Sequence, residues 1–273
     1  MSDYQQWVGK TLEQTDVITQ SGVDRFCATL GLAHDSNVAP YGYQWCLCLP
    51  DTPTSELGHD GHPPKGGFMP PIDLPRRMWA ASQVEFRRPL PLGATIVKRS
   101  RIAAINEKTG KTGALAFVEV EHETLVNDEL AIKEQQTIVY REAADKALPL
   151  PAADAGKPDG WQIVEQLNPD PTLLYRYSSL TFNTHRIHYD LPYAQSEELY
   201  PALVVHAPLM ATQVLQLAAQ HGELKQFSFK AVSAAFCNQP LYLAANIEGL
   251  HGKISTIGGD GRTCLQADVT FRA

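Results

Sequence analysis

A segment without any period divides the chain into two parts. It reads "AADKALPLPAADAGKPDG", covers residues 143–160, and is rich in Ala, Pro, Asp and Gly, which is typical of a linker. Residues 1–142 lie before it and residues 161–273 after it, and each part has the length of an ordinary domain. We therefore expect two structural units joined by a linker.

Both parts are predicted to place at least one helix before a series of four strands. The first part begins with a short helix, continues through a loop rich in Pro and Gly, and then contains four strand-like runs. The second part begins with a strand predicted at residues 173–182, followed by a short and a longer apolar helix and four further strands. The predicted helices cover residues 22–31, 191–199 and 208–221, and the other strands cover residues 81–89, 95–106, 113–125, 130–141, 227–236, 240–250, 251–258 and 263–271.

The run "FVEVEHETL" shows the alternation of a half-buried strand. Val118, Val120, His122 and Thr124 fall on one face, and the glutamates between them fall on the other. "NEKTGKTG", residues 106–113, is a natural turn between two such strands. Because a helix followed by antiparallel strands occurs twice, the fold class predicted is α+β, a double hotdog in which each sheet wraps a helix.

Composition and charge exclude several classes of function. The formal net charge of −7 argues against a nucleic-acid partner, because phosphate binding needs clustered Lys and Arg. The most apolar window, residues 202–219, is interrupted by His206, Pro208 and two glutamines, so no membrane span is predicted. The five cysteines lack metal-type spacing and the start of the sequence lacks a secretory signal, so we expect reduced thiols and a cytoplasmic protein.

The stretch "TFNTHRIHYD", residues 181–190, carries the strongest chemical signal. His185 and His188 lie three residues apart, and His206 follows in the apolar run "LVVHAPLMA". A zinc site would use these three histidines, with Asp190 as a fourth ligand, but the segment resembles a loop without helical period, and no metal is predicted. The alternatives are an acid–base site and histidines that only support the fold. "HDGH", residues 59–62, has the same spacing and is predicted to be a solvated loop.

These two stretches carry a family resemblance. "FNTHRIHYD" resembles the D-x-N-P-x-H-x-D segment of MaoC-type enoyl-thioester hydratases and dehydratases, and "LVVHAPLMA" resembles their V-H-G segment before the central helix. "HPPKGGFMPPIDLPRRMWAASQVEF" is also similar to the branch that contains hydroxyacyl-thioester dehydratase type 2, mesaconyl-CoA hydratase and itaconyl-CoA hydratase. The chain departs from the wider family in having Asn183 at the aspartate position and Ala207 at the glycine position, where the methyl group can trim the pocket.

The resemblance implies a mechanism for specific residues. His188 would be the base that activates water for attack at C3 of a 2-enoyl thioester. The amide oxygen of Asn183 would hold that water, which would supply both the hydroxyl and the proton to one face. The backbone N–H of Ala207, at the start of a helix with Pro208 in its first turn, would stabilise the thioester oxyanion.

The remaining candidates divide into supporting and substrate-binding residues. His185 is expected to be structural, and Asp190 is expected to cap the helix at residue 191. His206 is expected to brace the start of the long helix beside the substrate. Arg186 is either an exposed loop charge or a ligand for a substrate carboxylate or a CoA phosphate. For Arg76 and Arg77, we expect one to contact CoA phosphates and the other to be structural.

The function predicted is a hydro-lyase acting on an enoyl-CoA, such as itaconyl-CoA or mesaconyl-CoA. Coenzyme A enters only as part of the substrate, and no separate cofactor is expected. The alternatives are a 3-hydroxyacyl-thioester dehydratase of fatty-acid synthesis, a thioesterase and a non-catalytic acyl-CoA-binding module. The first part lacks a matching histidine segment, because the surroundings of His34 differ. We therefore expect a degenerate hotdog beside a catalytic one, a pseudo-dimer with one working site that is free to pair further as a homodimer.

Overall fold

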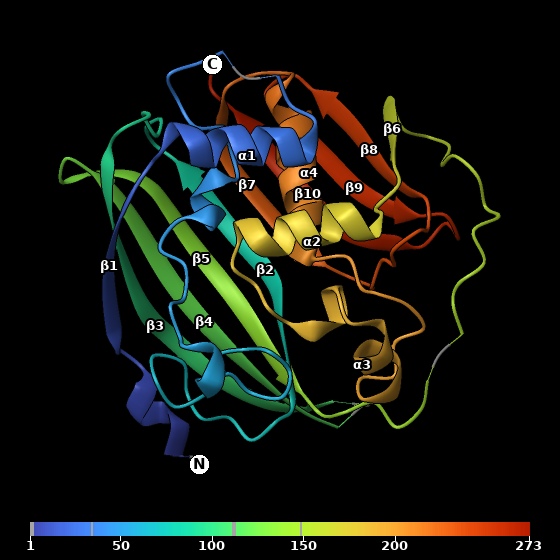
Figure 1. Cartoon of the computed structure of the whole chain (residues 1–273). Helices are drawn as coiled ribbons and strands as arrows, with labels where there is room; N and C mark the ends of the chain where they lie inside the picture. Colours follow the sequence, from blue (N-terminus) through green and yellow to red (C-terminus); the bar gives the residue numbers. More distant parts are fainter. Residues whose placement is uncertain (1–2, 34, 111–112, 148) are drawn as a thin grey trace.

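One antiparallel sheet of ten strands runs through the described part of the chain (Figure 1). The computed structural model describes residues 3–33, 35–110, 113–147 and 149–273. The strands of the first half are β1 (Thr11–Val17), β2 (Arg76–Phe86), β3 (Thr95–Gly110), β4 (Gly113–Val126) and β5 (Glu129–Arg141). Those of the second half are β6 (Ile163–Leu167), β7 (Leu224–Ala231), β8 (Leu241–Glu248), β9 (His251–Gly258) and β10 (Thr263–Phe271).

The strand order relates the two halves to each other. The sheet runs β1-β3-β4-β5-β2-β7-β10-β9-β8-β6, so the first strand of each half lies at an outer edge and its second strand lies at the centre. There β2 pairs with β7 over five residue pairs, from Ala81↔Lys230 to Glu85↔Gln226. Two units of equivalent strand order therefore meet edge to edge, and the predicted α+β double hotdog is confirmed.

The helices make the two halves unequal. The α-helices are α1 (Gln20–Leu30), α2 (Pro171–Leu180), α3 (Leu191–Ser196) and α4 (Ala207–Ala219), and the 3-10 helices are η1 (Asp3–Trp7), η2 (Tyr43–Cys46), η3 (Thr54–Glu56) and η4 (Arg186–His188). Helices α1 and α2 each follow the first strand of their half and lie side by side. Helix α4 packs inside the second half of the sheet, whereas the segment between α1 and β2 in the first half contains only η2 and η3.

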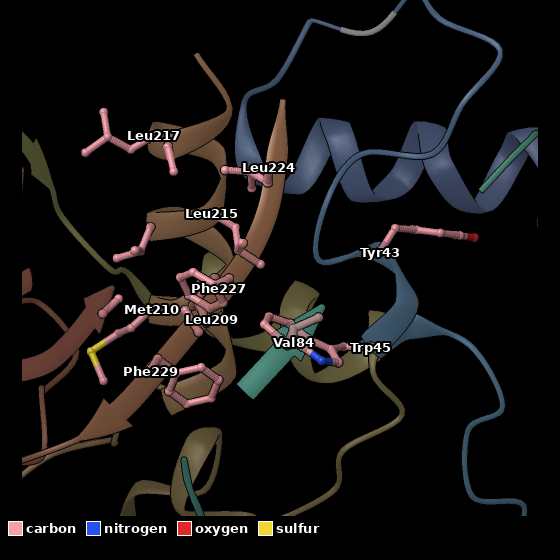
Figure 2. Packing of buried hydrophobic residues seen from close by; sticks show 14 of the residues in the cluster. Tyr43, Trp45, Val84, Leu209, Met210, Leu215, Leu217, Leu224, Phe227 and Phe229 are labelled. Atoms are coloured by element: carbon pink, nitrogen blue, oxygen red, sulfur yellow. The ribbon is translucent and has the colours of Figure 1, made fainter. Parts of the chain in front are cut away.

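Apolar side chains around α4 form the main core. Leu209, Met210 and Leu215 of α4 are at most 2% exposed, and Phe227 and Phe229 of β7 pack against them (Figure 2). Trp45 from η2 and Val84 from β2 belong to the same cluster, so the first half also covers this helix. Each fully buried side chain of this size contributes roughly 1.5–3 kcal/mol. The core thus fixes the N-terminal end of α4 relative to both halves.

Several local expectations can be compared with the structure. Val118 and Val120 of β4 are buried, as their alternation predicts. The strand predicted at residues 173–182 is wrong, because these residues form most of helix α2 and the turn that follows it. No helix or strand occurs among the described residues between 142 and 162. His34, and Lys111 and Thr112 of the predicted turn, lie outside the described residues. Within the described part, no helix has the length and apolar character needed to cross a membrane.

Candidate active site

The loop after α2 brings the predicted site residues together. Phe182 has a φ of 47°, a left-handed conformation that turns the chain out of the helix. The amide oxygen of Asn183 then accepts the backbone N–H of His185 at 3.0 Å, an Asx-type turn. The short helix η4 follows and places His188 in the interior. The oxygen that was expected to hold a water therefore also holds the loop, and the amide nitrogen of Asn183 has no partner among the described residues.

His188 is oriented by a single hydrogen bond. Its Nδ1–H donates to the carbonyl oxygen of Val204 at 2.7 Å, since a carbonyl can only accept. The neutral ring then has its lone pair on Nε2, and Nε2 has no partner among the described residues. Burial lowers the pKa of His188 well below 6.5, and the neighbouring His206 and His185 lower it further. The side chain is a neutral imidazole at physiological pH with a free basic nitrogen.

His206 packs against one side of His188. Its ring is stacked on that of His188, with centroids 3.6 Å apart and planes 19° apart. Nε2 of His206 forms a 2.8 Å hydrogen bond with the hydroxyl of Ser178 on α2. The residue is 1% exposed, and this burial lowers its pKa to about 3. His206 therefore acts on the site through His188, because its own surface is almost completely covered.

His185 lies on another side of His188 and is bound to a carboxylate. Its Nε2–H donates to Oε1 of Glu198 at 2.7 Å. Its ring meets that of His188 almost perpendicularly, with centroids 5.6 Å apart. Arg76 of β2 forms an ion pair with the same carboxylate at 3.5 Å and also donates to the backbone oxygen of Glu198. A strand of the first half thus holds a residue that anchors the loop of His185 and His188.

A loop of the first half docks directly on the site. The hydroxyl of Thr184 donates to the backbone oxygen of Gly61, and the N–H of Arg186 donates to that of Asp60 at 3.0 Å. The ring of His62 lies 4.2 Å from that of His185, and its Nδ1 bonds the carboxylate of Asp60 at 3.0 Å. The prediction of a solvated loop here is correct for His59, whose side chain is 73% exposed, but wrong for Gly61, which is buried, and for His62, whose side chain is only 19% exposed.

The three candidate arginines differ in how their charges are compensated. Arg186 donates to Asp190 through Nε and Nη2, at 3.0 and 2.7 Å, and its guanidinium covers the ring of Tyr193. Asp190 in turn is the N-cap of α3. Arg76 is paired with Glu198, as described above. Arg77 donates to the backbone oxygen of Pro63 at 2.7 Å and has no carboxylate within 4.0 Å among the described residues. Arg77 therefore has the most unused donors of the three.

Helix α4 begins beside His188 without a capping side chain. The side chains of Thr19, Asp170 and Asp190 each accept an N–H in the first turn of α1, α2 and α3. His206 occupies the equivalent position of α4 and makes no such bond. Within the described ranges, the N–H of Ala207 has no partner. The first turn of α4 therefore offers a hydrogen-bond donor to a ligand.

The geometry does not bring the histidines together as metal ligands. Nε2 of His185, Nδ1 of His188 and Nε2 of His206 are all engaged in hydrogen bonds. The rings of His188 and His206 are stacked face to face, so their nitrogens do not converge on one point. The described part of the chain contains no cluster of three or more His, Cys, Asp or Glu side chains able to hold a metal ion.

Comparison with known proteins identifies the family. The sequence model of hydroxyacyl-thioester dehydratase type 2 matches residues 42–237. This chain belongs to that family. A mesaconyl-C(4)-CoA hydratase of Chloroflexus aurantiacus is 40% identical to it over 98% of both chains. The mitochondrial hydroxyacyl-thioester dehydratase type 2 of Schizosaccharomyces pombe is 27% identical over 86% of this chain and 89% of that protein. The family expected from the histidine motifs is therefore confirmed.

The solved structures agree with the fold. A MaoC-like dehydratase from Phytophthora capsici superposes with a TM-score of 0.71 and 15% identity, over 97% of this chain and 96% of that one. At this identity the likeness concerns the architecture alone.

The sequence did not identify every residue of the site. Glu198, Asp60 and Gly61 were not predicted, and His62 was assigned to a solvated loop. Ser178 was placed on a strand that is in fact helix α2. The one sequence signal that could have pointed to the first-half loop was "HDGH", because its two histidines have the same spacing as His185 and His188.

Proposed function

We propose that this member of the hydroxyacyl-thioester dehydratase type 2 family adds water to the double bond of a short dicarboxylic enoyl-CoA such as mesaconyl-CoA. The observation that carries the proposal is the orientation of His188, whose Nδ1–H is bound to Val204 and whose Nε2 is free. The 40% identity with a mesaconyl-C(4)-CoA hydratase over the full chain supports the substrate class. The hydro-lyase predicted from the sequence agrees with both.

His188 is the base in this proposal. Its Nε2 takes a proton from water as the water oxygen attacks C3 of the enoyl group. Because its pKa is held well below 6.5, the imidazole is unprotonated across the neutral pH range. The stacked ring of His206 restricts its rotation. The base is thus both available and fixed in direction.

The start of α4 receives the charge that develops. Attack at C3 moves electrons toward the thioester oxygen, and the unpaired N–H of Ala207 is suited to bind that oxygen. The positive end of the α4 dipole contributes in the same direction. Asn183 assists at the other end of the reaction, where its free amide nitrogen donates to the oxygen of the attacking water and its amide oxygen keeps the loop in place.

The second carboxylate of the substrate needs a cation. Arg186 was a candidate, but its guanidinium is already bound to Asp190. Arg77 is better suited, because it has unused donors and its charge lies near Asp60 and His62, and the ring of His62 packs against that of His185. We assign recognition of the distal carboxylate to Arg77, and binding of CoA phosphates remains a prediction for the other basic residues.

The test follows the enoyl-thioester absorbance of crotonyl-, itaconyl- and mesaconyl-CoA in the ultraviolet. Wild type should hydrate the dicarboxylic substrates, and His188→Ala should be at least about 10²-fold slower. The matched control is His221→Ala, because that histidine is exposed and makes no side-chain contact with the site. Arg77→Gln should slow only the dicarboxylic substrates. Equal rates for wild type and His188→Ala would contradict the proposal.

A second function is favoured by the family itself. A 3-hydroxyacyl-thioester dehydratase would use the same residues in the reverse direction, and turnover of crotonyl-CoA alone would identify it. A thioesterase is disfavoured because α4 contains no carboxylate, and release of free CoA thiol would reveal one. Binding of acyl-CoA without any turnover would indicate a binding module.

We also place the protein in the cytoplasm, since its five cysteines are all free and burial is the chief cause that raises the thiol pKa of each. Self-association as a homodimer remains a prediction, and the elution volume in size-exclusion chromatography with light scattering tests it.

A further inference from the structure

Hydration of an enoyl thioester requires two proton movements, and the site so far explains one. A base must take a proton from water, and C2 must receive a proton. The amide of Asn183 cannot exchange a proton with the substrate. A second group that carries a proton beside His188 would supply C2 directly, without return of the proton that His188 takes from water.

His185 has the position and the surroundings of such a group. Its Nε2–H is bound to Glu198, so any proton that it exchanges with a substrate must be on Nδ1. Nδ1 of His185 has no partner in the described part of the chain and is not among its fully enclosed unpaired atoms. The same holds for Nε2 of His188. Two neighbouring imidazoles, with ring centroids 5.6 Å apart, are thus each anchored by a hydrogen bond through one ring nitrogen. In each ring the second nitrogen has no partner among the described residues.

Glu198 is the feature that distinguishes His185 from a histidine that only fills space. Burial raises the pKa of this carboxyl, but the hydrogen bond and charge of His185 and the charge of Arg76 outweigh burial, and the pKa lies below its usual value. The carboxylate is therefore ionised at neutral pH and accepts the Nε2–H of His185. His188 has only a backbone carbonyl at its anchored nitrogen, which favours the neutral ring.

We propose that His185, held by Glu198, is the second catalytic residue and delivers the proton to C2. In the hydration direction, Nε2 of His188 takes a proton from water, the water oxygen bonds to C3, and the π electrons of the C2–C3 bond move into the thioester enolate. The enolate then forms a C2–H bond with the proton of His185 Nδ1. His188 finishes protonated and His185 neutral, and transfer of one proton between them through solvent restores the starting state.

The proposal rests on the proposed hydratase function and predicts a particular pH dependence. The rate requires a neutral His188 and a protonated His185, so kcat/KM should rise and then fall with pH. Titratable or charged groups face His185 from the first-half loop, from β2, from its own loop, from α3 and from the segments that flank α3 and α4. These groups are Asp60, His62, Arg76, Arg77, His188, Tyr193, Glu198 and His206.

The experiment compares pH–rate profiles of wild type, His185→Gln and Glu198→Gln on mesaconyl-CoA. His185→Gln should be about 10²–10⁴-fold slower. It should also lose the basic limb of the profile, which is the fall in kcat/KM at high pH, because the group whose deprotonation causes that fall is gone. Glu198→Gln should keep the limb but shift it to lower pH, since a negative charge beside the acid is gone. His221→Gln is the matched control and should have the wild-type profile.

Each outcome decides the question. A basic limb that persists unchanged in His185→Gln would restrict His185 to a structural role and overturn the proposal. If that variant does not fold, as judged by circular dichroism, the position of the limb in Glu198→Gln carries the test, and an unshifted limb overturns it. Absence of hydration in wild type would instead contradict the proposed function, so the two failures are distinguishable.

Discussion

At the scale of single residues, Gly61 shows how closely the first half approaches the loop of residues 183–190. Its φ of +85° is a conformation that residues with a side chain rarely adopt. A Cβ atom at this position would overlap the carbonyl oxygen of Thr184, and that same residue donates its hydroxyl to the Gly61 oxygen. The close backbone contact between the two halves therefore depends on a glycine.

Gly61→Ala should both destabilise the protein and impair the site. The added methyl displaces the loop that carries Asp60 and His62, and His62 packs on His185. Gly93→Ala is a matched control, because Gly93 has a similar φ of +79° but nothing within 4 Å of its Cβ position. The control should lose only about 1–2 kcal/mol for the left-handed conformation, with unchanged kcat. Chemical denaturation and initial rates measure both effects, and equal losses in the two variants would refute the packing argument.

The sequence predicts the site only where its residues are neighbours along the chain. Asn183, His185 and His188 are recognisable because they lie in one short motif that the fold keeps together. Gly61 and Glu198 reach the same site from distant positions, and nothing in their local sequence indicates the contact. The expected roles of the arginines also depended on partners that only the fold brings within reach.

At the scale of elements, α4 differs from the other described α-helices. Its first turn has no side-chain cap among the described residues. His206, which precedes it, has φ −62° and ψ 131°, an extended conformation compatible with a following proline. The helical position of Ala207 also suits the fixed φ of proline. A proline can therefore remove one N–H group here while the helix is retained.

Ala207→Pro should lower kcat by about 10²–10³-fold, which is typical of losing one oxyanion donor. Ala207→Gly keeps the N–H and is the control, with a rate close to wild type. Circular dichroism and thermal unfolding verify that both variants fold. Wild-type turnover in a folded Ala207→Pro variant would show that this N–H does not stabilise the transition state.

Helix α2 illustrates why one element was predicted incorrectly. Tyr175 and Tyr177 alternate with polar residues, a pattern that is typical of a strand. The helix is instead set by Asp170, which accepts the N–H of Leu173 at 2.7 Å, and by Pro171 in the first turn. Its buried residues, Leu174, Tyr177 and Ser178, follow helical spacing. The capping signal in the sequence was more informative than the alternation.

At the scale of the whole molecule, burial of uncharged histidines makes stability depend on pH. Burial lowers the pKa of His62 to about 4, of His122 to about 3 and of His206 to about 3. In the unfolded chain these groups titrate near 6.5. As pH falls below 6.5, the unfolded state gains protons that the folded state excludes, so the free energy of unfolding decreases, by up to about 1.4 kcal/mol per histidine and pH unit.

The denaturant midpoint should therefore be clearly lower at pH 5 than at pH 7. Asp60 and Glu198 add to the loss at more acidic pH, because their pKa values are lowered in the folded state and this stabilisation disappears as they protonate. His122→Gln, far from the catalytic loop in β4, should reduce the difference between the two pH values. Identical midpoints at pH 5 and pH 7 would contradict the assignment of neutral buried histidines.

The seam between β2 and β7 has a consequence for how the chain is made. On the ribosome, β2 gains β5 as its neighbour on one side once β5 has emerged, while β7 is synthesised only after residues 143–160 and all the described helices of the second half. Until then the nascent first half carries an open strand edge, the kind of surface that pairs with other chains. Refolding of the full chain should for the same reason give more aggregate as protein concentration rises, because β2 can pair with a neighbouring molecule before its own β7 arrives.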